Sequence, residues 1–119
     1  IIFRSYRAGD GTSDLWIINT DGSGERRLTN LHALAWDPVF HPQGNHVVFA
    51  SNHLPSSETP GQNFDLFLLS LEDAVLERVT YDAGHDTLPS FSRDGKLITW
   101  TSSRQGGINQ IFTAQWSDG

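Results

Sequence analysis

The stretch Phe91–Ser102 (FSRDGKLITWTS) repeats the pattern of Phe40–Ser51 (FHPQGNHVVFAS) at a spacing of 51 residues. The same spacing relates Pro38 to Pro89, Asp14–Trp16 to Asp65–Phe67, and Leu28–Thr29 to Val79–Thr80. Shorter copies occur near both ends, where Ile2–Ser5 aligns with Val48–Ser51 and Gln110–Phe112 aligns with Asp65–Phe67. The middle copy carries an insertion at His53 to Asn63. A repeat of this length predicts a series of similar structural units that pack against one another.

Each unit is predicted to contain four β-strands. The last copy supplies Pro89–Ser92 and Lys96–Ser102, and the middle copy supplies Asp65–Ser70 and Leu76–Thr80. Asp94-Gly95 lies between the first two strands and is a hairpin signal, since glycine supplies the positive φ that such turns need. Gly44 holds the same place in the middle copy. The third strand is almost continuously apolar, which predicts that both of its faces are covered.

Four strands per unit, with apolar middle strands and a polar outer strand, are typical of a propeller blade. We therefore predict an all-β fold of four-stranded antiparallel β-propeller blades, about two and a half of them, from a ring of six to eight. The blades are assigned to residues 1–36 (partial), 37–87 and 88–119 (partial). A β-sandwich is the alternative fold, but it does not require a repeat of this length.

Composition narrows the classes of partner. The 119 residues carry a net charge of −6, which argues against nucleic acid or an anionic membrane surface as a partner. No apolar run is long enough for membrane insertion. The chain has no cysteine, so disulfides and thiolate metal sites are excluded. Because it begins Ile1-Ile2-Phe3 inside an expected strand, we expect the remaining blades to come from missing chain or from other copies.

The stretch Phe91–Arg104 resembles the signature of TolB-like (WD40-like) β-propeller repeats. Asp14–Ile17, followed by Arg27–Thr29, resembles the second half of that signature. Arg93 departs from it by replacing the usual proline. The resemblance implies a larger periplasmic or extracellular protein whose propeller binds a protein or peptide partner. The family also includes propellers that gate prolyl oligopeptidase-type enzymes and propellers that hold a metal in the central channel. A divalent cation in that channel is therefore the one cofactor that the resemblance leaves open.

Five residues are candidates for a binding site. His85 and Asp86 precede an inner strand, near one mouth of the expected channel, and can bind a metal ion or a ligand. Alternatively, they cap turns and bond between blades. His32, Trp36 and Asp37 occupy a similar place one blade earlier. Trp36 can offer a stacking surface to a sugar or peptide, or it can pack at the junction between blades.

A second group of residues recurs in the repeat and is predicted to be structural. A serine ends the second strand of each unit and is followed two positions later by arginine in two of the three copies. Arg7 and Asp14 are predicted to form a charge-assisted hydrogen bond across their hairpin. Histidines 41 and 46 flank a hairpin turn, where we expect them to be solvated. The recurring residues are Ser5, Arg7, Asp14, Gly44, Ser51, Asp65, Asp94, Gly95, Ser102 and Arg104.

The sequence contains no Gly-x-Ser-x-Gly elbow and no phosphate-binding loop. We therefore predict a non-catalytic module that binds a protein or peptide. The alternative is the propeller of an enzyme, either a prolyl oligopeptidase-type gating domain or a metal-dependent lyase, whose catalytic residues lie largely outside this chain. A third hypothesis is a short chain that builds a ring from several copies.

Overall fold

Ten β-strands form three antiparallel sheets, and the chain contains no helix within the residues that the structure describes. The computed structural model describes residues 1–53 and 63–117. The first sheet contains β1 (Ile2–Ser5), β2 (Asp14–Ile17) and β3 (Arg26–Arg27). The second contains β4 (Ala35–Phe40), β5 (His46–Ser51), β6 (Asp65–Ser70) and β7 (Leu76–Arg78). The third contains β8 (Asp86–Phe91), β9 (Leu97–Ser102) and β10 (Gln110–Gln115). The all-β prediction is confirmed.

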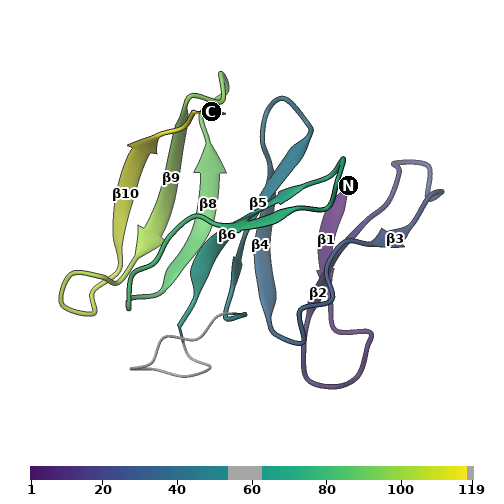
Figure 1. Ribbon diagram of the computed structural model, residues 1–119, viewed down its shortest axis with the longest axis horizontal. Helices are drawn as coiled ribbons and strands as arrows, with labels where there is room; N and C mark the ends of the chain where they lie inside the picture. Colours follow the sequence, from purple (N-terminus) through teal and green to yellow (C-terminus); the bar gives the residue numbers. More distant parts are fainter. Residues whose placement is uncertain (54–62, 118–119) are drawn as a thin grey trace.

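The three sheets stand side by side as successive blades, which we call blades one, two and three (Figure 1). Blade two is complete, with the strand order β4-β5-β6-β7 from inner to outer. Blade one begins at the second strand of the pattern, and blade three ends at the third strand. This arrangement confirms the predicted partial propeller. Most of the predicted insertion at His53 to Asn63 lies outside the described residues.

The core lies between the blades rather than inside one sheet. Successive residues of a strand face opposite sides, so each blade presents two faces. Blade two turns Val47, Phe49, Phe67 and Leu69 toward Leu15 of blade one. It turns the alternating set, Val48, Ala50, Leu66 and the partly buried Leu68, toward Ile98 of blade three. Its third strand is therefore covered on both sides, as its continuous apolar sequence predicts.

The far face of blade three differs from the corresponding face of blade two. Thr99 and Thr101 alternate with Ile98 and therefore face away from blade two. Thr113 and Ile111 are their cross-strand partners on β10. Ile111 is 80% exposed, and Thr113 is also exposed. The repeat places valine, alanine and two leucines at these positions in blade two, so the outward face of blade three is the more polar one.

Both inner strands contain a bulge at the same repeat position. The β4–β5 register shifts between Trp36 and Val39, and the β8–β9 register shifts between Thr87 and Ser90. Asp37 and Leu88 lie in these bulges, and each has a φ of 54°. The predicted blade boundaries at 36/37 and 87/88 therefore fall inside β4 and β8. The bulges also account for Pro38 and Pro89 inside these strands, because a proline is tolerated within a strand at a bulge.

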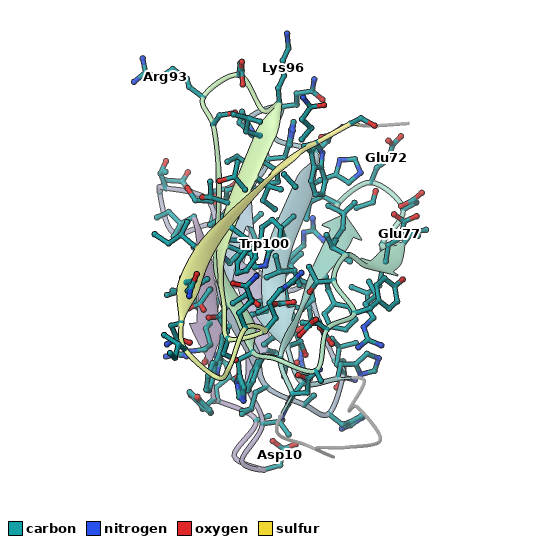
Figure 2. All side chains as sticks on the ribbon, turned by 90° about the vertical axis from the view of Figure 1, so that its left-hand side faces the viewer. Asp10, Glu72, Glu77, Arg93, Lys96 and Trp100 are labelled. Atoms are coloured by element: carbon teal, nitrogen blue, oxygen red, sulfur yellow. The ribbon has the colours of Figure 1, made fainter. Side chains whose placement is uncertain are left out.

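The β4–β5 hairpin of blade two and the β8–β9 hairpin of blade three both turn at the upper edge of the sheets in Figure 1, and a contact from His41 joins them. Figure 2 shows Arg93 and Lys96 at this edge, Asp10 at the lower edge and Trp100 between them. His41 is only 3% exposed. Its Nε2 lies 3.1 Å from the Gly95 carbonyl oxygen of blade three, and its ring packs edge-on against Phe91. The expectation that His41 is solvated is wrong, because the neighbouring blade covers it.

Candidate functional site

The five predicted site residues lie on or beside the lower edge, where the inner strands β4 and β8 begin (Figure 1). His32 is in the loop before β4, and Trp36 and Asp37 are on β4. His85 precedes β8, and Asp86 is the first residue of that strand. The shared edge follows from the repeat, because equivalent strand ends lie at the same side of adjacent blades. The local contacts, however, separate these residues into different roles.

Asp86 is a buried ion-pair partner rather than an open ligand. Its side chain is 0% exposed, and Arg104 Nη2 donates to its two carboxylate oxygens at 3.2 and 3.1 Å. Its backbone N–H donates to the Phe64 carbonyl at 2.8 Å, which joins blade three to blade two. Both oxygens are thus engaged inside the protein. These contacts agree with the alternative in which Asp86 bonds between blades, and its ligand or metal role stays a prediction.

Four aromatic side chains, Tyr6, Trp36, Phe64 and His85, form a row that crosses all three blades. We call them the aromatic row. The Trp36 and Phe64 rings are stacked at 4.5 Å, and the His85 ring lies 5.7 Å from Phe64. Trp36 Nε1 donates to the Tyr6 hydroxyl at 3.3 Å. Tyr6 is 48% exposed and His85 is exposed, whereas Phe64 is buried beneath them. Trp36 therefore both packs at the junction and contributes to an accessible surface.

Arg4 lies at one end of the aromatic row. Its guanidinium carbon is 5.4 Å from the centre of the Tyr6 ring and 5.6 Å from that of Trp36. The Arg4 side chain is exposed. Sequence reasoning missed this residue and Tyr6, because β1 and β4 belong to different blades and no fixed spacing connects them. Cation–π contacts of this kind hold a long, flexible side chain in place.

Asp37 and His32 flank the row without joining it. Asp37 is half-buried, and its Oδ2 accepts a hydrogen bond from the Leu88 N–H of blade three at 3.3 Å. His32 is exposed and has a φ of 53°. The Thr12 hydroxyl and N–H lower the pKa of Asp10, and the positive charge of His32 adds a smaller effect in the same direction. Asp37 thus links the two inner strands, while His32 remains accessible.

A buried aspartate connects the third and outer strands in blades one and two. Asp14 pairs with Arg27 and accepts from the Thr29 hydroxyl. Asp65 pairs in the same way with Arg78. Burial raises the pKa of Asp65, although the bond from Arg78 acts in the opposite direction. The predicted Arg7–Asp14 bond is wrong, since Arg7 pairs with Glu25 instead. The correct signal was present in the Arg-x-Thr segments of the repeat.

The serines that end the second strands hold the turn that follows. Ser5 Oγ accepts from Arg7 N and Nε at 3.2 and 3.1 Å, and Ser102 Oγ accepts from Arg104 N and Nε at 3.2 and 2.9 Å. Ser51 Oγ accepts from the His53 N–H at 3.1 Å. In each case the donors are backbone or guanidinium N–H groups of the turn that follows the serine, so these bonds lie within single blades.

Three further findings concern pockets, metal ligands and membrane-spanning helices. A pocket of about 150 Å³ is formed by β5, β6, β7 and the β6–β7 turn, and it contains none of the predicted site residues. Its lining consists of His46, Leu68, Ser70, Asp73, Val75 and Glu77. Within residues 1–53 and 63–117, no three His, Cys, Asp or Glu side chains are grouped so that they can hold a metal ion. No helix in the same residues is long and apolar enough to cross a membrane.

Comparison with known proteins gives two curated relatives. The Tol-Pal system protein TolB of Nitratidesulfovibrio vulgaris is 24% identical over 135 aligned residues, which cover 83% of this chain and 30% of TolB. Dipeptidyl-peptidase 5 of Porphyromonas endodontalis is 32% identical over 78 residues, which cover 64% of this chain and 11% of the peptidase. No family model matches the chain. The chain thus spans less than a third of each relative.

The solved structures agree with the three-blade arrangement. The crystal structure of TolB from Acinetobacter baumannii superposes with a TM-score of 0.79 at 24% identity. The match covers 99% of this chain and 27% of that protein. At this level of identity the similarity establishes the fold of the blades.

Proposed function

We propose that this chain, whose three sheets are blades of a TolB-like β-propeller, acts as a non-catalytic module that binds a protein or peptide partner. The larger protein that contains it functions in the periplasm or outside the cell. The further blades of the ring come from additional chain or from other copies. In this proposal the partner contacts the lower edge, through His85, Trp36 and the flanking residues His32 and Asp37.

The observation that carries the proposal is the aromatic row. It presents rings with polar atoms at an accessible edge, which is the kind of surface that protein interfaces favour. Its members are anchored by regular elements: Trp36 is on β4, and the His85 N–H donates to Ser103 Oγ at 2.8 Å. A rigid scaffold of this kind reduces the entropy that binding would otherwise cost. The similarity to a Tol-Pal system protein supports a role in a protein assembly.

The experiment is site-directed photo-crosslinking in the native host. A photoreactive phenylalanine analogue replaces His85 in one variant and Val75 in a control. Val75 is 49% exposed and lies in the β6–β7 turn, away from the row. We expect a discrete protein adduct from position 85 alone, and we expect Trp36→Ala to abolish it. Equal labelling from both positions, or an adduct that survives Trp36→Ala, refutes the site. Release of the protein by osmotic shock tests its periplasmic location.

The similarity to dipeptidyl-peptidase 5 supports a second candidate function. In that case the blades belong to the propeller of a peptidase whose catalytic groups lie outside this chain. The full-length protein would then release short peptides from unstructured substrates, and a serine-directed inhibitor would stop the release. A full-length protein that binds its partner and shows no turnover supports the binding module. Metal analysis of the same preparation tests the further possibility of a lyase with a cation in its channel.

A further inference from the structure

Arg4 differs from the other arginines in what surrounds its guanidinium group. Arg7, Arg27, Arg78 and Arg104 each pair with a carboxylate. Within the described residues, Arg4 has no carboxylate partner and instead faces the Tyr6 and Trp36 rings. The remaining cations without such a partner, Arg26, Arg93 and Lys96, are exposed and lie over no aromatic ring in the same part of the chain. Among the arginines and lysines, Arg4 is thus the one that combines a ring contact with the lack of a carboxylate partner within residues 1–53 and 63–117.

The repeat shows that the blade itself does not require this arginine. Arg4 is opposite Leu15 on β2, and the corresponding residue of blade two is Ala50, opposite Leu66. Blade three has Thr101 at this position. Three different residue types at one packing position argue that Arg4 serves something other than the common fold. Its location at the lower edge, beside the accessible aromatic row, points to a ligand.

We propose that Arg4, Tyr6 and Trp36 form a binding site for an aspartate or glutamate side chain within an extended segment of the partner. The inference rests on the proposed function and names what the partner must present. A guanidinium group offers a planar fork of N–H donors that matches a carboxylate. The Tyr6 hydroxyl already accepts from Trp36 Nε1, so its own proton is available to donate. Charge complementarity therefore selects an acidic residue.

The rest of the row determines how the segment runs. From Trp36 the ring centres proceed to Phe64 at 4.5 Å and to His85 at a further 5.7 Å. An extended chain advances about 3.3 Å per residue, so roughly three residues cover this path. The Arg4 guanidinium lies a further 5.6 Å from the Trp36 ring centre. An acidic residue at Arg4 therefore places an apolar or aromatic residue, roughly three to five positions away, over the exposed face beside His85. A segment that passes along the row in this way uses an internal side chain rather than a chain terminus.

The test is selection from a phage-displayed library of random peptides on the intact protein, followed by titration with synthetic amidated copies of the selected peptides. We expect enrichment of aspartate or glutamate at one fixed position. Arg4→Gln should weaken binding about tenfold or more, the effect of losing a charge-assisted hydrogen bond. Arg26→Gln is the matched control, because Arg26 is an exposed strand arginine without a ring contact, and it should leave binding unchanged. Added salt should weaken the wild type more than Arg4→Gln.

Each other outcome has a distinct meaning. Selected peptides without acidic enrichment, bound equally by Arg4→Gln, overturn this inference and leave the proposed function standing. Peptides that bind only through a free terminal carboxylate overturn the assignment to an internal side chain. If the wild type retains no peptide, the proposed function and the inference fail together. A thermal melt of Arg4→Gln shows whether the variant is folded. If it is not, the test uses Trp36→Phe, which removes the hydrogen bond to Tyr6 and should also weaken the binding of the acidic peptides selectively.

Discussion

Two glycines in equivalent hairpins should respond very differently to the same substitution. Gly44 and Gly95 have φ values of +82° and +74°, so an alanine is strained at either position, by about 1–2 kcal/mol. A Cβ on Gly44 would meet nothing within 4 Å. A Cβ on Gly95 would lie 2.8 Å from Cε1 and Nε2 of His41. The comparison separates backbone strain from the packing between blades two and three.

The His41 ring cannot easily move away from such a methyl group. Its Nδ1 accepts from the Gln43 N–H at 3.2 Å, which leaves Nε2 to donate to the Gly95 carbonyl at 3.1 Å. Phe91 packs edge-on against the ring at 4.8 Å. Overpacking a site of this kind costs about 1–3 kcal/mol. We therefore expect Gly44→Ala to cost about 1–2 kcal/mol and Gly95→Ala about 2–5 kcal/mol in total.

Urea unfolding followed by tryptophan fluorescence measures both costs, provided that the m value stays constant. The control background is His41→Ser, which gives blade two the serine that blade three carries at Ser92. In that background the ring is gone, so Gly95→Ala should cost no more than Gly44→Ala. Equal costs in the wild type, or an excess that persists without His41, would show that the two hairpins do not interlock as described.

Two further predictions concern charged groups. Arg78→Leu leaves the buried Asp65 without its cation and should destabilise the protein by about 3–5 kcal/mol at neutral pH. Burial already raises the pKa of Asp65, so the difference in Tm from wild type should shrink as the pH falls and that carboxyl is protonated. A difference in Tm that stays constant with pH would refute the reasoning. Hydrogen bonds from the Ser92 hydroxyl and, to a smaller extent, the Lys96 N–H lower the pKa of Asp94 below its usual 3.8. The contribution of the Asp94 carboxylate to folding stability is therefore present above that pH and is lost as the pH falls through the lowered value. Asp94→Asn should make the stability less dependent on pH in acid titrations followed by circular dichroism.

The regular features of the fold were predictable because they are local or periodic. The Asp94-Gly95 turn, the apolar run Asp65–Ser70 and the spacing between copies all depend on residues close in sequence or on one repeated distance. The structure has β6 at Asp65–Ser70, as predicted. The bulges at Asp37 and Leu88 were not predictable, because they are visible only in the strand register and the backbone φ. Neither residue type favours a positive φ strongly enough to indicate one from the sequence.

The candidate site was only partly predictable for a different reason. Position along the repeat was enough to bring His85 and Trp36 to the same edge. It did not show that Asp86 forms an ion pair with Arg104, since that pair joins the first residue of β8 to the turn that follows β9. Nor did it reveal Arg4 and Tyr6, whose partner Trp36 lies on another blade. Contacts that cross blades have no characteristic spacing, so they require coordinates.

The two faces of the blades also limit which blade could be duplicated to lengthen the repeat. A repeat lengthens by tandem duplication only if the new copy fits its own parent. Blade two has apolar side chains on both faces, with Val48 and Leu66 on one and Phe49 and Phe67 on the other, so two successive copies of it would be compatible. Blade three would set Thr99 and Thr113 against its own Ile98 and bury unpaired hydroxyl groups. The middle blade is therefore the natural template for duplication, and the third is a poor one.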